Sequence, residues 1–332
     1  MIQLKKKNVI ADFSSFRCDM FLTITMFLVF VVLMFTQQIF AQNIRIDKYK
    51  GQPQTISKLR VASASILPDK WQKERNWQRI EKMVRKAVSE GGSRVVVTPE
   101  GVLDGYVINE VNAVKEPQQK QEILKRFFDL AEPIDGPFIK KACELADELD
   151  IFLVMGFLER RDELLYNTAI LIDIDGDIIG RYSKTHFAQG YSKNPEFYCA
   201  GNEYPVFDTP FGKVGILICY DRQLPEPARI LAVKGAQVLF VPSYGSYTDD
   251  NGWNTALMRT RAYENALPVI FCNPYQSLLI TDRGEIKAVG TAGEIVYYDI
   301  KTSPQRYTKR FENRRPATYG ALVNDEDPAK KK

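Results

Sequence analysis

Short apolar runs and amphipathic stretches alternate along the chain from Leu59 to Asn273. The run "RVVVTPE" is rich in β-branched residues, as expected of a strand that is covered on both faces. In the stretch before it, Trp77, Ile80 and Val84 recur at helical spacing. Strands and helices that interleave in this way predict an α/β fold. Since neither an internal repeat nor a long linker interrupts the pattern, we expect one domain over residues 59–300.

The two ends of the chain differ in composition from this region. Residues 1–41 contain a basic start, an apolar stretch from Met20 to Phe35 and small residues near Ala41, which is typical of a secretory signal peptide. We therefore expect a periplasmic or secreted protein. A retained membrane anchor, which would bring membrane contact, and a buried core segment are the alternatives. Residues 301–332 are polar and predict a C-terminal extension.

Charge and cysteine spacing exclude several classes of protein. Lys and Arg number 45 against 41 Asp and Glu, a net charge of +4, and we find no basic stripe with interleaved aromatic residues. We therefore expect no nucleic-acid binding. The five cysteines form no CxxC pair and have no zinc-like spacing, and His186 is the single histidine. This composition predicts no metal site.

The stretch "VGILICYDRQLPEPAR" brings a thiol, Cys219, to the end of an apolar strand-like run. Pro225 and Pro227 favour a helix start, because the N–H that proline lacks has no partner there. Free backbone N–H groups at a helix start stabilise a thiolate, and the Tyr220 amide can help to hold an oxyanion. Cys219 is therefore a candidate nucleophile. A buried structural cysteine is the alternative.

Two other polar side chains also follow strand-like runs. Glu100 ends "RVVVTPE", and Lys184 lies in "GRYSKTH". Taken singly, the first suits a helix cap or a surface carboxylate and the second a solvated charge. Because ligands of α/β sheets collect at the carboxyl ends of strands, we expect both beside Cys219 at the same sheet edge. Together they would supply a base, a cation and a nucleophile in one cleft.

Four segments carry a family resemblance in their order and spacing: "TPEGVLDGY", "YNTAILIDIDGDIIGRYSKTH", "GILICYDRQLPEPARILAVKGAQVLFVPS" and "RTRAYENALPVIFCN". They resemble the signature segments of the nitrilase, or carbon-nitrogen hydrolase, superfamily. The resemblance implies a four-layer αββα sandwich of the nitrilase type that pairs into homodimers or larger assemblies. It also implies a catalytic triad, which falls on Glu100, Lys184 and Cys219 in this sequence.

The resemblance further implies a reaction that needs neither a metal nor an organic cofactor. Glu100 would take the thiol proton while Cys219 attacks a carbonyl, and a thioester would form and then be hydrolysed. The family also has a second glutamate between the lysine and the cysteine. Glu196 fits this role better than Glu203, because it precedes an aromatic pair and a glycine, although the spacing is shorter than the family's. A loop-surface acid is the alternative reading of Glu196.

The residue after the nucleophile bears on the substrate. Nitrile-hydrolysing members of the superfamily tend to have Trp-Glu after the cysteine, whereas this chain has Tyr220 and Asp221. This resemblance implies a small-molecule amide or N-carbamoyl substrate, with nitrile hydrolysis as the alternative. Tyr106, Tyr220 and Tyr244 are the candidate substrate-binding residues, with core packing as the alternative for an aromatic side chain.

Three other classes of protein compete with this interpretation. A Cys–His protease would have to pair Cys219 with His186, the only imidazole available. A metallohydrolase would lack ligands. A catalytically silent binding or scaffold protein of the same fold would be expected to have lost members of the triad, yet Glu100, Lys184 and Cys219 are all present.

Overall fold

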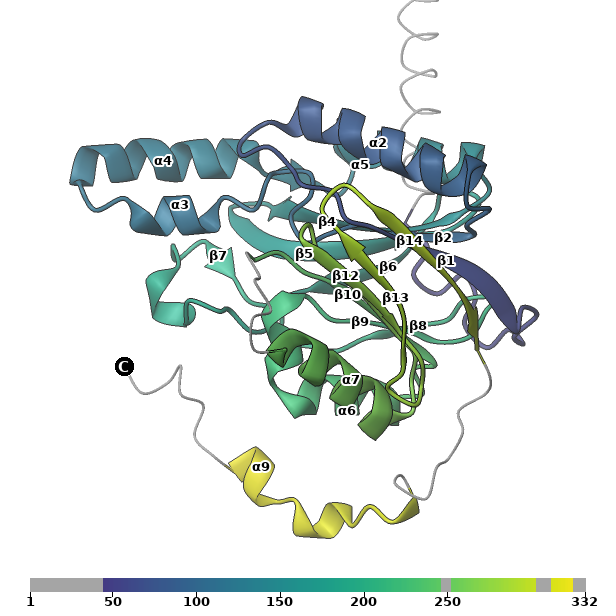
Figure 1. Cartoon of the computed structure of the whole chain (residues 1–332). Helices are drawn as coiled ribbons and strands as arrows, with labels where there is room; N and C mark the ends of the chain where they lie inside the picture. Colours follow the sequence, from purple (N-terminus) through teal and green to yellow (C-terminus); the bar gives the residue numbers. More distant parts are fainter. Residues whose placement is uncertain (1–43, 246–251, 303–311, 325–332) are drawn as a thin grey trace, which may run out of the picture. The chain divides into compact units, whose positions relative to one another are not determined.

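The computed structural model describes residues 44–245, 252–302 and 312–324, which form two β-sheets with flanking helices (Figure 1). The signal-peptide or anchor segment lies outside the described residues, so its prediction stays untested. None of the described helices combines the length and the apolarity that a membrane span requires.

The first sheet has the order β14-β1-β2-β4-β5-β6, with β3 paired to β4 and β7 paired to β5. Its strands are β1 (Lys58–Ala64), β2 (Val95–Val97), β3 (Glu132–Pro133), β4 (Phe152–Arg161), β5 (Leu164–Ile172), β6 (Ile178–Ser183), β7 (Tyr198–Cys199) and β14 (Ile295–Lys301). The second sheet has the order β13-β12-β11-β10-β9-β8. Its strands are β8 (Val206–Phe207), β9 (Val214–Ile216), β10 (Val238–Pro242), β11 (Val269–Cys272), β12 (Gln276–Ile280) and β13 (Ile286–Thr291).

Parallel pairing dominates the centre of both sheets. In the first, β2 lies parallel to both β1 and β4, and in the second, β10 lies parallel to both β9 and β11. Antiparallel strands flank these centres; β4 pairs with β5, and β5 pairs with β6 across the turn "IDGD". The carboxyl ends of the central strands therefore lie together within each sheet.

Helices cover the outer face of each sheet. The described helices are α2 (Lys73–Ser89), α3 (Ile108–Ala113), α4 (Pro117–Leu130), α5 (Pro137–Glu148), α6 (Pro225–Val233), α7 (Trp253–Asn265) and α9 (Ala321–Asn324), with 3₁₀ turns η1 (Tyr191–Lys193), η2 (Cys219–Gln223) and η3 (Pro316–Thr318). Apolar residues of α2 and α5 pack on the first sheet, and those of α6 and α7 pack on the second.

The inner faces of the two sheets pack against each other. One buried cluster contains Val97 and Val154 from the first sheet with Ile216 and Phe240 from the second. Val95–Val97 is buried throughout, because its alternate side chains enter this inner cluster and the outer cluster under the helices. Helix, sheet, sheet and helix thus form the layers, and the predicted αββα sandwich is confirmed.

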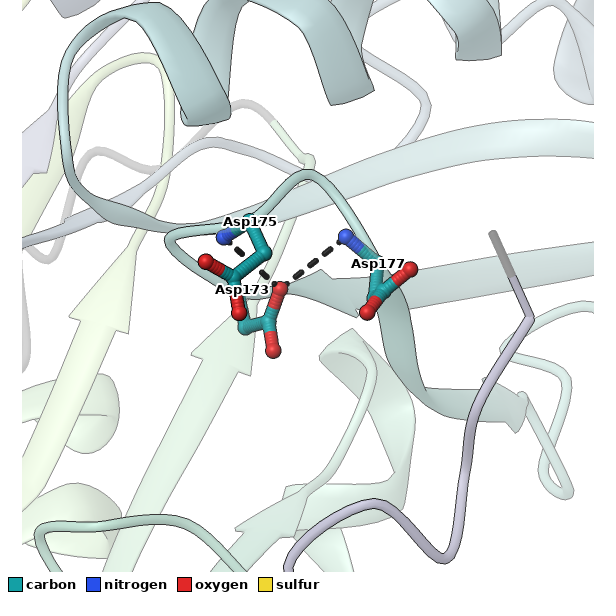
Figure 2. Close-up of side chains that lie close together, drawn as sticks. All are labelled: Asp173, Asp175 and Asp177. Atoms are coloured by element: carbon teal, nitrogen blue, oxygen red, sulfur yellow. Dashed lines mark hydrogen bonds between the residues drawn. The ribbon is translucent and has the colours of Figure 1, made fainter. Parts of the chain in front are cut away.

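An acidic turn between β5 and β6 binds the beginning of the described chain. The backbone N–H groups of Asp175 and Asp177 donate to Oδ1 of Asp173, which gathers the three carboxylates (Figure 2). Their oxygens are close enough to hold a metal ion. However, the ammonium of Lys48 lies 2.6, 2.6 and 2.7 Å from Asp173, Asp175 and Asp177. The cluster therefore binds a cation of the chain itself.

Candidate active site

A tight loop after β2 carries Glu100. Gly101, Gly105 and Tyr106 all have left-handed backbone angles, with φ of 55°, 88° and 52°. On the other side of the loop, a Cβ on Gly156 of β4 would lie 2.6 Å from the Pro99 carbonyl oxygen and 2.9 Å from Glu100 Cα. The glycine in β4 therefore lets the backbone at Glu100 rest directly on the strand.

The Glu100 carboxylate is fully buried and accepts three hydrogen bonds. Lys184 Nζ and Asn167 Nδ2 donate to Oε1 over 2.6 and 2.7 Å, and the Tyr244 N–H donates to Oε2 over 2.8 Å. Lys184 is buried as well. Burial by itself lowers the pKa of Lys184, but the charge of Glu100 raises it well above its ordinary value. Lys184 is thus held as an ammonium beside Glu100.

Cys219 begins η2 with a left-handed backbone, at φ 47°, which is unusual for a residue with a side chain. Its Sγ donates to the Tyr244 carbonyl over 3.3 Å. The same residue, Tyr244, gives its N–H to Glu100, so a single residue after β10 contacts both the carboxylate and the thiol.

Two details differ from the sequence prediction. The three residues were expected at one edge of one sheet, but Glu100 and Lys184 follow strands of the first sheet and Cys219 follows β9 of the second. They meet because the two sheets stack face to face. In addition, the thiol starts the turn η2, and the proline-led helix α6 begins only at Pro225.

Arg222 is a buried cation of the site. Its Nη1 donates to the Cys219 carbonyl over 2.6 Å and lies 3.4 Å from Cys219 Sγ. Its Nη2 donates to Oδ1 of Asn254 in α7 over 2.9 Å. Arg222 therefore fixes both the left-handed backbone and the sulfur of Cys219. The only signal in the sequence was an arginine three residues after the cysteine.

Asp221 joins the lysine loop to the cysteine turn. It accepts hydrogen bonds from Tyr182 Oη, Thr185 Oγ1 and the His186 N–H on one side and from the Ile218 N–H on the other. His186 Nδ1 also lies 3.0 Å from an Asp221 oxygen. Asp221 therefore connects the two loops, and it also orients the imidazole of His186.

Two of the three tyrosines predicted to bind substrate form an aromatic wall beside these groups. The rings of Tyr106 and Tyr244 stack with centroids 4.7 Å apart, and Lys184 Nζ lies 5.7 Å from the Tyr106 centroid. Tyr220 follows Cys219 in η2 and is half-buried. The wall is nearly closed to solvent, because Tyr106 and Tyr244 are 7% and 9% exposed.

The structure does not bring either candidate for the second glutamate into this cluster. Glu196 is exposed in the loop after η1, and among the described residues its carboxylate contacts none of Glu100, Lys184 and Cys219. Glu203 is exposed and lines a separate surface hollow of about 320 Å³. The position of Glu196 before an aromatic pair therefore did not identify a carboxylate buried in this cluster.

A different buried carboxylate, Asp104, shapes the loop after Glu100. It accepts hydrogen bonds from the N–H groups of Tyr106 and Leu158, over 2.9 and 2.8 Å. Burial raises the pKa of Asp104 to about 6 in spite of these donors. Asp104 thus holds the backbone of Tyr106 in place. When Asp104 is ionised, its buried charge lowers the stability of the folded state.

Asp104 makes the stability of the fold depend on pH. Between pH 3.8 and about 6 the folded state binds more protons at this residue than the unfolded state, so stability falls as pH rises through that window. Two pKa units correspond to about 3 kcal/mol. Urea unfolding of the wild type and Asp104→Asn on both sides of the window should show this fall in the wild type only. Equal slopes in the two proteins would contradict the prediction.

Comparison with known proteins places the chain in one class, enzymes that act on carbon-nitrogen bonds. The family model "Carbon-nitrogen hydrolase" matches residues 60–303. The chain belongs to the carbon-nitrogen hydrolase family, within the nitrilase superfamily, as its motifs predicted. Its class as a hydrolase is thereby confirmed.

Individual relatives are similar over most of their length. The citrullinase of Francisella tularensis is 30% identical over 278 residues, 75% of this chain and 92% of the relative. The N-carbamoylputrescine amidase of Arabidopsis thaliana is 28% identical over 73% of this chain and 88% of its own. Among solved structures, an amidase from Nesterenkonia superposes with a TM-score of 0.65 at 20% identity, covering 81% of this chain and 98% of that one. Saccharomyces cerevisiae Nit3 gives 0.61 at 24%, covering 83% and 98%.

Proposed function

We propose that this chain hydrolyses an amide or N-carbamoyl group through a thioester on Cys219. The observation that carries the proposal is the contact of Tyr244 with both the Cys219 thiol and Glu100, which is itself ion-paired with Lys184. A nucleophile, a base and a fixed cation are thus gathered in a buried site, as acyl transfer requires.

The residues support a complete reaction cycle. Glu100 takes the thiol proton while Sγ attacks the carbonyl carbon, and the Lys184 ammonium and the Tyr220 N–H stabilise the oxyanion. The proton passes to the nitrogen of the leaving group, the C–N bond breaks, and ammonia or an amine departs from the thioester. Glu100 then takes a proton from water, which attacks the thioester, and the acid product and the thiol are released. Every step uses groups of the chain, the substrate and one water molecule.

The names of the relatives favour an amide or carbamoyl substrate over a nitrile. The two curated relatives compared above are a citrullinase and an N-carbamoylputrescine amidase. Tyr220 and Asp221 after the cysteine agree with that branch.

A panel of small amides, ureas and nitriles, with ammonia release as the readout, tests this function. The wild type should release ammonia from amides or carbamoyl compounds, and Cys219→Ala should release none. Turnover that survives this substitution would exclude the thiol mechanism. Binding of panel members without turnover would instead indicate a catalytically silent binding protein of the same fold.

His186 separates this mechanism from a Cys–His protease. Because His186 pairs with Asp221, we expect His186→Ala to lose less than about 100-fold in kcat. A Cys–His enzyme would lose about 10⁴-fold or more. Initial rates of ammonia release measure the difference, and a loss near the larger value would require a different base.

We also propose that two copies of the chain associate through α6 and α7. These helices contact each other and expose large apolar side chains, namely Ile230, Val233, Trp253 and Tyr263. Large exposed apolar side chains on neighbouring helices favour an interface. Sedimentation velocity should show a dimer or a larger assembly that Val233→Glu weakens. A wild type that stays monomeric at all concentrations would exclude this association.

Export remains a proposal that rests on residues 1–41 alone. If a signal peptidase removes them, the mature protein begins near Gln42. Sequencing of the amino terminus of the purified protein decides between cleavage and a retained anchor.

A further inference from the structure

Two oppositely charged side chains lie at the edge of the aromatic wall. Lys70 precedes α2, and Glu110 lies in α3. Lys70 Nζ and Glu110 Oε1 are 3.8 Å apart, and the two side chains are 35% and 42% exposed. We call these two residues the rim pair. Their separation is longer than a direct charged hydrogen bond, so each charge keeps access to a further partner.

The rim pair lies one tyrosine side chain away from the reacting groups. Lys70 Nζ is 4.7 Å from the ring centroid of Tyr244 and donates to the Tyr106 carbonyl over 2.8 Å. The backbone of the same Tyr244 contacts Glu100 and Cys219. Tyr244 therefore links the rim pair to the groups around the sulfur.

Neighbouring groups fix the orientation of Glu110. Trp71 Nε1 donates to Glu110 Oε2 over 2.6 Å, and Trp71 itself has a left-handed backbone at φ 63°. The Arg126 guanidinium stacks 4.3 Å above the Trp71 ring. With Oε2 held by Trp71, Oε1 faces Lys70. The carboxylate is thus placed before any ligand arrives, which lowers the entropic cost of binding.

The rim pair favours a ligand that carries both charges. A ligand with only an ammonium would pair with Glu110 but meet repulsion from Lys70, and a ligand with only a carboxylate would meet the reverse. A zwitterion satisfies both residues. Burial lowers the pKa of Lys70, and the nearby carboxylates of Glu110 and Asp104 act in the opposite direction. A ligand carboxylate would add to this stabilisation of the ammonium.

We propose that the rim pair binds the α-amino acid end of the substrate, with the ligand ammonium on Glu110 and the ligand carboxylate on Lys70. The substrate class is then an α-amino acid whose side chain ends in a carboxamide or ureido group, directed at Cys219. This inference rests on the proposed hydrolysis and specifies what the same site recognises.

Matched substrate pairs test the inference. Citrulline is compared with N-butylurea, and glutamine with butyramide, so that each pair shares the reacting group and differs only at the charged end. The wild type should favour one of the zwitterions by about ten-fold or more in kcat/KM, as expected for hydrogen bonds to charged groups. Glu110→Gln, which keeps the size of the side chain, should reduce this preference about ten-fold. Lys70→Met should do the same.

The controls separate this inference from the proposed function. Glu122→Gln changes an exposed acid of α4 in the same way and should leave the preference as it is. If the wild type prefers the uncharged partners, or if the rim variants keep the preference, the inference is wrong while Cys219-dependent hydrolysis stands. Turnover of other amides but of neither zwitterion would also overturn it. Loss of all Cys219-dependent turnover on the broad panel would instead remove the proposed function.

Discussion

Replacing Lys184 with methionine is expected to abolish nearly all turnover and to destabilise the fold. The substitution leaves the buried Glu100 carboxylate without its ion-pair partner, which is costly in a buried site. The cation that faces the oxyanion is lost as well. We expect kcat to fall by about 10³-fold or more and the free energy of unfolding to fall by about 3 to 5 kcal/mol.

A double variant separates chemistry from stability. Adding Glu100→Gln to Lys184→Met removes the unpaired charge and leaves an amide whose oxygen can replace one of the two carboxylate oxygens that accept from Asn167 and the Tyr244 N–H. Stability should recover in part, as it does when both partners of a buried pair are removed, while turnover stays lost. Urea unfolding and ammonia release at saturating substrate measure the two effects. Turnover that recovers together with stability would show that the pair only supports the fold.

The sequence was sufficient for the α/β class because that class depends on periodicity, whereas the four-layer arrangement came from the family resemblance. Val95–Val97 is buried on both faces, and the helical spacing of Trp77, Ile80 and Val84 places them in one buried cluster. These patterns require no knowledge of which strands pair. The direct contact of Glu100 with Lys184 agrees with the expectation that polar residues after strands converge.

The contacts that complete the candidate site depend on tertiary packing and have no periodic signal. Asn167 in the middle of β5 and the backbone of Tyr244 both bind Glu100, and neither arrangement is visible in local sequence. Arg222 reaches the sulfur only because η2 folds its side chain back onto Cys219. The stacking of two sheets, rather than the edge of one, brings Cys219 to the other groups. For the same reason, sequence spacing alone pointed to Glu196 as the second glutamate, although Glu196 is exposed in the structure.

Gly156→Ala is expected to impair turnover strongly, although Gly156 bears no functional group. An added Cβ would lie 2.6 Å from the Pro99 oxygen, 2.9 Å from Glu100 Cα and 3.0 Å from the Gly101 nitrogen. All three are backbone atoms, so the clash is relieved only if the segment that carries Glu100 moves. A shift of this kind displaces the carboxylate from its donors and should reduce kcat about 100-fold.

Gly180→Ala is the matched control, because it also adds a Cβ to a glycine within a strand but does not contact the backbone that carries Glu100. Its added Cβ would lie 2.9 Å from the Phe207 ring, a side chain buried between the sheets. Overpacking costs about 1 to 3 kcal/mol in such places, so both variants should lose stability to a similar extent. Only Gly156→Ala should also lose kcat. Equal losses of kcat would mean that turnover follows general stability, and the strand glycine would then have no special part in placing Glu100.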